Sequence, residues 1–232
     1  MSTRADCPFG LCDGSGMRLD FETNTASPCR CRAQEISRRR ARSLSAVIPR
    51  RYRSVSFDAP PVTEIEPRVV AATRRFATRI DAQLDAGRGL WFMGSPGTGK
   101  TTLAMLVSKA ALDAGRSVAI YSLPRLLNEI RDTYRAERSH IALLDRLTAV
   151  DLLHIDDVGA EKSNEWVLEE LYSIINARYE DERSIVITTN ILDRDQLREQ
   201  ITSRTVSRLT EMCDELPLTG HDHRIKMDLR TA

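Results

Sequence analysis

The chain has 232 residues and a net charge of +1, with 41% hydrophobic and 29% charged residues. This length suits one large domain with a smaller appendage, and the composition is typical of a globular protein. No apolar run approaches the roughly 18 residues that span a membrane. The N-terminus has no apolar signal-peptide segment, so we expect a cytoplasmic protein with no membrane partner.

Residues 1–35 are expected to form a small zinc-binding module. Four of the five cysteines lie here, at Cys7, Cys12, Cys29 and Cys31, and glycines follow Cys12 as in a zinc knuckle. Clustered cysteines in a reducing compartment bind metal more often than they form disulfides, and four thiolates complete a structural Zn²⁺ site. The Cys-x₄-Cys and Cys-x-Cys spacings are less standard than paired Cys-x-x-Cys, so free or redox-active thiols remain the alternative. Bound zinc would supply folding energy that so short a segment lacks.

Residues 36–63 are expected to form a short Arg-rich helix followed by a linker. Nine arginines and a single acid, Glu35, lie between residues 30 and 53. Such a basic segment is either a solvated linker or a contact for nucleic acid or an acidic partner surface, and both interpretations stay open. Prolines punctuate the second half, where Tyr52 and Phe57 are expected to dock the linker onto the next domain.

Residues 64–232 alternate between helical and extended patterns, which predicts an α/β fold. Apolar residues at three- and four-residue steps predict a first helix over 66–86. Short apolar runs predict strands at 89–94, 117–122, 151–158, 184–190 and 214–219, and further helices are expected at 99–114, 124–136, 164–181, 193–199 and 201–212. Strands of this kind are typical of a parallel sheet covered on both faces by helices.

The segment GSPGTGKT, residues 94–101, matches the phosphate-binding pattern G-x-x-x-x-G-K-[ST] in full. Its glycines let the loop curl so that backbone amides face phosphate oxygens, and the following helix offers its positive end. Lys100 would bridge the β- and γ-phosphates, and Thr101 would bind Mg²⁺. A chance glycine-rich loop is disfavoured by the apolar strand before it and the amphipathic helix after it. The expected nucleotide contacts are Gly94, Ser95, Pro96, Gly97, Thr98, Gly99, Lys100, Thr101 and Thr102.

Polar residues end the strands at 151–158 and 184–190. Asp156 is placed to bind Mg²⁺, directly or through water, and Asp157 is the candidate to polarise the attacking water. Asn190 could sit between the γ-phosphate and that water. Acids and asparagines also simply end strands, but the order of these residues after the phosphate loop favours a catalytic site.

Arginines supply the remaining candidates for nucleotide contact. Arg204 and Arg208 are four residues apart on the expected helix at 201–212, so they share one side of it. One of them could reach a nucleotide held by a neighbouring subunit, as an arginine finger does. The alternative is a solvated helix face that includes Glu211. Arg224 is a weaker candidate for contacting the phosphates of its own chain.

The order of phosphate loop, acid-ended strand, polar-ended strand and arginine helix resembles that of AAA+ ATPases. The segments IDDVGAEK, ITTN, IPRRYRSVSFD and SRLTEMCDELPLTGHDHR are similar to DnaC/DnaI-type helicase loaders and the related IstB transposition ATPases, over roughly residues 47–226. The resemblance implies a five-stranded parallel sheet of order 5-1-4-3-2, with the polar-ended strand between the two nucleotide-binding strands. Because the sequence ends at Ala232, we also expect no helical lid domain, which suits loaders better than most AAA+ proteins.

The resemblance also assigns residue roles. Gly94, Gly97, Gly99, Lys100 and Thr101 match the Walker A loop, Asp156 and Asp157 match Walker B, and Asn190 matches sensor 1. Arg208, in SRL, fits the trans-acting finger best, with Arg204 one turn earlier. Arg224 occupies the place of the terminal sensor arginine, although GHDHR departs from the usual aromatic–Arg pattern.

The resemblance implies a slow, DNA-stimulated ATPase that uses ATP and Mg²⁺ and assembles into an open ring or spiral. Single-stranded DNA would lie along the inner surface, and the partner would be a hexameric DnaB-like replicative helicase. Residues 1–35 would grip this helicase, with nucleic-acid binding as the competing role; some phage-encoded loaders begin with similar cysteine-rich segments. The alternatives are an IstB-like transposase-assisting ATPase, which usually begins with a helical domain, and an ATP-dependent DNA-binding adaptor with little hydrolysis.

Overall fold

The computed structural model describes residue 7, residues 10–20, 23–29, 31–32, 48–135, 140–159, 164–220 and residue 222. Most of the expected Arg-rich helix, and Arg224, lie outside these residues. No helix in the described ranges is long and apolar enough to cross a membrane.

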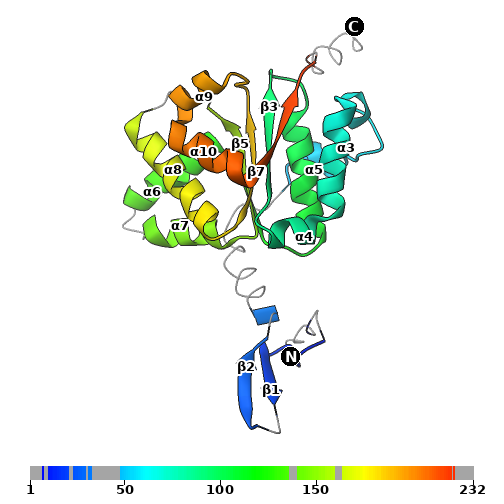
Figure 1. Ribbon diagram of the computed structural model, residues 1–232, viewed down its shortest axis with the longest axis vertical. Helices are drawn as coiled ribbons and strands as arrows, with labels where there is room; N and C mark the ends of the chain where they lie inside the picture. Colours follow the sequence, from blue (N-terminus) through cyan, green and yellow to red (C-terminus); the bar gives the residue numbers. More distant parts are fainter. Residues whose placement is uncertain are drawn as a thin grey trace.

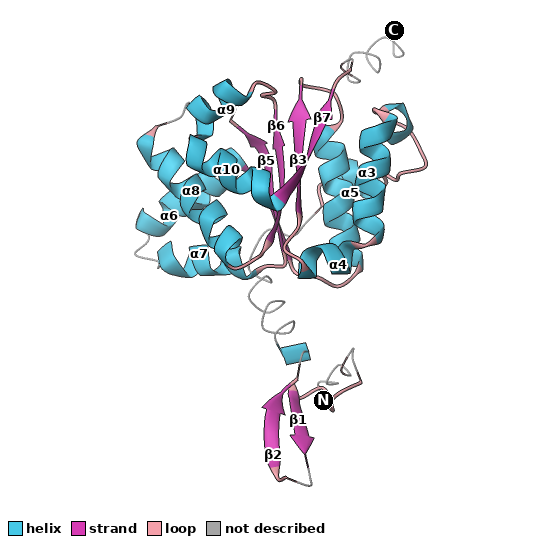
Figure 2. Ribbon diagram, viewed as in Figure 1, coloured by secondary structure: helices cyan, strands magenta, loops and turns pink. Residues whose placement is uncertain are grey.

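Five parallel strands form the centre of the fold (Figure 2), and their order places β6 between β3 and β5, as expected. The order is β4-β5-β6-β3-β7. The strand numbers in this order differ from those in the expected order 5-1-4-3-2, because an N-terminal hairpin takes the labels β1 and β2 and the first strand of the domain is therefore β3. Counted from β3 as the first strand of the domain, the order read from the β7 edge is 5-1-4-3-2. The strands are β3 (Gly89–Gly94), β4 (Val118–Ser122), β5 (Leu152–Val158), β6 (Ser184–Thr189) and β7 (Cys213–Leu218).

Helices cover both faces of this sheet (Figure 1). On one side lie α3 (Pro67–Thr78), α4 (Ile80–Asp85) and α5 (Lys100–Asp113). On the other lie α6 (Leu123–Arg135), α7 (His140–Ala149), α8 (Glu165–Glu180), α9 (Arg194–Ile201) and α10 (Ser203–Met212). The molecule therefore has the three-layer arrangement that buried parallel strands require.

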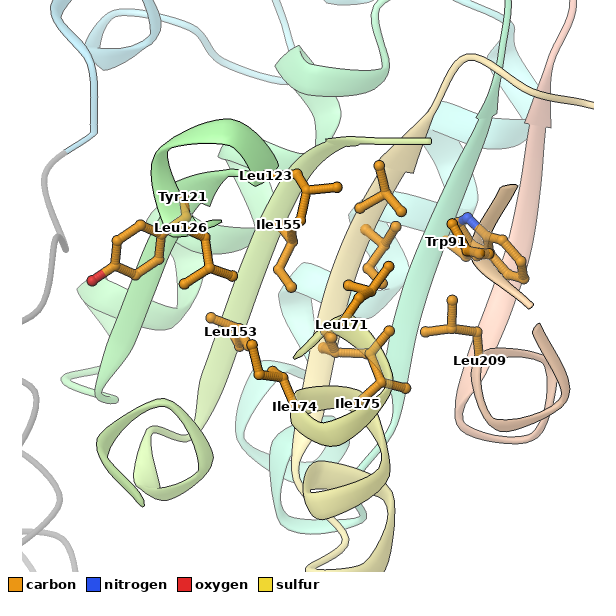
Figure 3. Packing of buried hydrophobic residues seen from close by; sticks show 14 of the residues in the cluster. Trp91, Tyr121, Leu123, Leu126, Leu153, Ile155, Leu171, Ile174, Ile175 and Leu209 are labelled. Atoms are coloured by element: carbon orange, nitrogen blue, oxygen red, sulfur yellow. The ribbon is translucent and has the colours of Figure 1, made fainter. Parts of the chain in front are cut away.

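The strands divide their side chains between two cores because successive residues point to opposite faces of a sheet. In β3, Trp91 and Met93 belong to the core under α6–α10, whereas Leu90 and Phe92 belong to the core under α3–α5. Figure 3 shows the first core, where Trp91 faces Leu209 of α10, and residues of α8 pack on β5. This alternation fixes the register of each strand and so fixes where its polar end emerges.

Two expectations for the helices were wrong. The single helix over 66–86 is two helices, α3 and α4, which meet at Arg79, whose backbone (φ −113°, ψ 28°) departs from helical geometry. Helix α7 was not expected at all. Its sequence buries only Leu143 and Leu147, so its apolar periodicity is too short to stand out.

The linker docks on the core as expected. A short helix, α2 (Arg50–Arg53), buries Tyr52, and Phe57 is half-buried against the same core. Arg74 of α3 covers the Phe57 ring at 5.1 Å from its centroid. A 3₁₀ turn, η1 (Val62–Glu64), leads from this docked segment into Ile65 and α3.

The N-terminal segment contains an antiparallel hairpin of β1 (Met17–Asp20) and β2 (Thr25–Pro28). Every side chain in these strands is exposed except that of Met17, which is half-buried. The hairpin therefore has no apolar core of its own within the described residues.

Candidate functional site

The phosphate loop connects β3 to α5, and its glycines adopt backbone angles that other residues avoid. Gly97 has φ +80° and Gly99, which caps α5, has φ +98°. Lys100 is buried, and its Nζ donates to the carbonyl oxygens of Gly94 and Ser95 at 2.7 and 2.8 Å. The loop thus holds its lysine in the centre of the curl, where the helix N-terminus already favours an anion.

Two residues that the sequence pattern did not single out contact this loop. A Cβ on Gly99 would lie 2.3 Å from Cδ1 of Ile65, so the docked linker packs directly against the loop. A Cβ on Gly97 would lie 1.8 Å from Oδ1 of Asp222. The residues in each contact lie far apart in the sequence, and no local motif predicts that they meet.

The residues expected to hold Mg²⁺ lie together. Asp156, near the end of β5, accepts a hydrogen bond from Thr101 Oγ1 at 2.9 Å and another from Thr188 Oγ1 at 2.7 Å, both at its Oδ1. One carboxylate oxygen therefore joins α5, β5 and β6. A carboxylate and a hydroxyl are hard oxygen ligands of the type that Mg²⁺ prefers, so this pair fits the ion.

Asp157 leaves the regular strand and turns toward Asn190. Its φ is +64°, and the pairing of β5 with β6 shifts register between Ile155 and Val158. A left-handed backbone costs a non-glycine residue roughly 1–2 kcal/mol, so the surrounding contacts must hold it. Thr188 Oγ1 accepts from the Asp157 backbone N–H at 2.8 Å, and Asn190 Nδ2 donates to Asp157 Oδ1 at 2.6 Å. The bulge thus pairs the expected water-polarising acid with the expected sensor.

A buried histidine lies two residues before Asp156. Its Nδ1 is 3.0 Å from Ser108 Oγ of α5, and Ser108 in turn donates to the Ala104 carbonyl at 3.1 Å. Burial lowers the pKa of His154 to about 4, against the opposing charge of Asp156, so the ring is neutral at pH 7. With Ser108 donating to Ala104, His154 donates through Nδ1, tying β5 to the helix that carries the loop.

Arg204 and Arg208 do not approach the loop of their own chain by any contact among the described residues. Both project from α10 toward α8, where each guanidinium lies over a tyrosine ring, at 4.7 Å and 4.1 Å from the centroid respectively. The structure therefore brings together the loop, Asp156, Asp157 and Asn190, and leaves the two arginines at a separate face.

The four N-terminal cysteines form one cluster. Their Sγ atoms all lie within 4.8 Å of one another, with 3.8 Å between Cys7 and Cys29 and 3.4 Å between Cys12 and Cys31. None is in a disulfide. Four sulfurs at about 2.3 Å from a tetrahedral Zn²⁺ are about 3.8 Å apart, so the cluster fits this ion with small adjustments.

A family model described as IstB-like ATP binding protein matches residues 33–231. The replicative helicase loader DnaC of Buchnera aphidicola subsp. Acyrthosiphon pisum (strain APS) is 26% identical over 162 residues, which cover 68% of this chain and 64% of that protein. The chain spans about half to two thirds of the length of the curated relatives it matches.

Solved structures give a similar result. A crystal structure of the DnaC helicase loader matches with a TM-score of 0.64 and 28% identity, covering 74% of this chain and 100% of that chain. A crystal structure of DnaI matches with a TM-score of 0.62 and 25% identity, covering 74% of this chain and 95% of that chain.

Proposed function

The chain belongs to the family of IstB-like ATP-binding proteins, of the AAA+ class, and from that premise we propose that it is a helicase loader. It would bind a hexameric DnaB-like replicative helicase and place it on single-stranded DNA when replication begins. The observation that carries this proposal is the match of the core to the whole chain of a DnaC helicase-loader structure. The replicative helicase loaders among its curated relatives support the same function.

ATP would bind in the curl of residues 94–102. Lys100, which now donates to two loop carbonyls, would exchange them for oxygens of the β- and γ-phosphates. Thr101 and Asp156 would hold Mg²⁺; Thr101 Oγ1 and Asp156 Oδ1 already lie 2.9 Å apart. The ion would offset negative charge on the phosphates during hydrolysis.

Hydrolysis would depend on the Asp157–Asn190 pair. The bulge and the Thr188 hydroxyl hold the backbone of Asp157, and Asn190 holds one carboxylate oxygen. The other carboxylate oxygen is then available to orient and polarise water beside the γ-phosphate. Asn190, bonded to that acid, would report whether the γ-phosphate is present.

Self-association into an open ring or spiral would complete the site. Arg208, or Arg204 one turn earlier, would reach the nucleotide of a neighbouring copy, and Arg224 would act within its own chain. Turnover would be slow and stimulated by single-stranded DNA, because hydrolysis serves assembly.

We divide the chain accordingly into residues 1–35 as a zinc-binding module that grips the helicase, residues 36–63 as an Arg-rich linker, and residues 64–232 as the AAA+ domain. The cysteine cluster supports zinc as the staple. Nucleic-acid binding by the zinc module is the competing role for the first segment.

A pull-down of tagged chain with purified replicative helicase tests the proposal. We expect the parent protein to retain the helicase in the presence of ATP and Mg²⁺, and Cys31→Ser to lose helicase binding. Lys100→Ala should lose ATP-dependent assembly but still bind the helicase through residues 1–35. Retention of an IS21-type transposase instead of the helicase would favour the transposase-assisting function. Helicase binding without any phosphate release on DNA would favour an adaptor.

A further inference from the structure

Two tyrosines of α8 support the two arginines of α10. Arg204 lies over the ring of Tyr172, and Arg208 lies over the ring of Tyr179. The two helices run side by side on the outer face of the sheet (Figure 1). We call these four residues the tyrosine–arginine rack.

Within the rack, Arg208 is held more firmly than Arg204. Arg208 is half-buried, whereas Arg204 is exposed. Besides its ring contact, Arg208 donates from Nε to Asn176 Oδ1 at 3.2 Å. Among the described residues, Arg204 makes only its ring contact. A stacked ring and a bond at Nε together fix both the plane and the direction of the Arg208 guanidinium.

The rack fixes Arg208 without neutralising it. Glu211, one turn further along α10, is the nearby acid, but it accepts from the Tyr179 hydroxyl at 2.6 Å and from Ser207 at 3.5 Å. This carboxylate raises the pKa of the Tyr179 hydroxyl, which therefore stays protonated and donating. Among the described residues, Arg208 forms no ion pair with a carboxylate; its guanidinium interacts with the side chains of Tyr179 and Asn176.

Other arginines in this region are handled differently. Arg194 is paired with Glu215 at 2.6 Å, and Arg88 is paired with Asp214. Those arginines are compensated by carboxylates, and their N–H groups are occupied. A ring face, in contrast, leaves the charge and the terminal N–H fork of Arg208 able to bind a planar or tetrahedral anion with two parallel hydrogen bonds.

From this geometry we infer that Tyr179 and Asn176 are positioning residues that hold Arg208 ready for the phosphates of ATP bound to a second copy of the chain. The inference rests on the proposed ring assembly. It also assigns the finger to Arg208, since that arginine alone has both a ring and an Nε acceptor.

Complementation between two inactive chains tests the inference. The acceptor chain carries Arg208→Ala, so it binds ATP but supplies no finger. The donor chain carries Lys100→Ala, so it supplies Arg208 but cannot use its own ATP. Each is assayed alone and in an equal mixture with ATP, Mg²⁺ and a single-stranded oligonucleotide, by phosphate release. We expect turnover in the mixture only.

Tyr179 is then altered in one chain at a time. Tyr179→Leu in the donor should lower the kcat of the mixture by about two- to fivefold, which is the effect expected from losing a partly exposed cation–π contact. Adding Asn176→Ala should increase the loss to about tenfold or more, because a charge-assisted hydrogen bond is also removed. The KM for ATP should not change, since only the acceptor binds it. Tyr179→Phe keeps the ring and should restore most of the turnover.

Two matched controls separate positioning from damage to the fold. Tyr179→Leu in the acceptor should leave turnover unchanged, although it perturbs packing equally. Tyr172→Leu in the donor removes the ring under Arg204. It should lower turnover no more than Tyr172→Phe in the donor, which removes only the hydroxyl that donates to Asn176 Oδ1 at 3.3 Å.

The outcomes distinguish the inference from its premise. Full turnover with the Tyr179→Leu donor, or a loss seen only with Tyr172→Leu, would overturn the role of Tyr179 while leaving a trans-acting arginine in place. If the mixture of Arg208→Ala and Lys100→Ala chains, with Tyr179 unaltered, releases phosphate no faster than the separate chains, the trans role of Arg208 is overturned. The role of Tyr179 would be overturned with it.

Discussion

Removing metal from the four-cysteine cluster should unfold the N-terminal hairpin and leave the AAA+ core folded. The perturbation is a chelator under reducing conditions or, in a separate protein, Cys31→Ser. Cys213→Ser is the matched control, because Cys213 is buried in β7 and lies outside the cluster.

The size of the effect follows from what the hairpin buries. Its strands expose every side chain except half-buried Met17, and an isolated two-stranded hairpin is marginally stable at best. Structural zinc contributes about 10–16 kcal/mol to small domains at neutral pH. Without metal, the free energy of opening the hairpin should fall to about zero or below, so that a large share of molecules is open. The core buries two separate apolar clusters and should keep its melting temperature.

Trypsin cleavage after Arg18, an exposed residue of β1, reports the opening. The fragment that ends at Arg18 should appear much faster after chelation or in Cys31→Ser, but not in Cys213→Ser. Metal analysis of the parent protein should give one zinc per chain. Zinc well below that ratio in reduced protein, or cleavage after Arg18 that chelation leaves unchanged, would refute the reasoning.

Three further predictions concern the core. Asp157→Asn keeps a residue that tolerates the left-handed backbone, so ATP binding should stay within about threefold while phosphate release falls about 100-fold or more; parallel losses of both would contradict the assigned role. Arg178→Met should lower the free energy of unfolding by about 3–5 kcal/mol, because this buried guanidinium donates to five backbone carbonyls from the end of α7 to the start of β6. Denaturant melts should show little change in the control Arg75→Met, which alters an exposed arginine of α3, and an equal effect of both variants would count against the explanation. Gly97→Ala should weaken ATP binding, since the new Cβ meets both a φ of +80° and the Asp222 carboxylate; adding Asp222→Ala should recover part of the affinity, and no recovery would show that this contact carries no weight.

The sequence predicts the central sheet well because its strands are short apolar runs with polar ends. The positions of β3, β5 and β6, and the meeting of Thr101 with Asp156, follow from patterns within a few residues of each strand end. Parallel strands gather their carboxyl ends at one edge, so the motifs come together once the order of strands is given.

Features built from distant contacts escaped prediction. Arg178 is an arginine in a helical pattern, and nothing near it in the chain shows that its guanidinium binds carbonyls of α7, of the connection before β5 and of β6. Asp222 meets Gly97 only because β7 lies beside β3. The tyrosine–arginine rack needs α8 and α10 to be adjacent, although Arg204 and Arg208 were recognisable from their spacing. In each case the local sequence pattern places one residue on its helix or loop, but only the arrangement of distant elements determines which residue it contacts.

The position of β6 has a consequence for synthesis of the protein on the ribosome. Strand β3, which leads into the phosphate loop, pairs only with β6 and β7 within the described sheet, and both are translated after residue 183. A nascent chain that stops before Ser184 can pair β4 with β5, but it leaves β3 without a neighbour. The loop emerges early, yet it gains a rigid support only when the last third of the domain has left the exit tunnel. Premature termination products that stop before Ser184 should therefore fail to form the ATP site, even though they contain the four-cysteine segment.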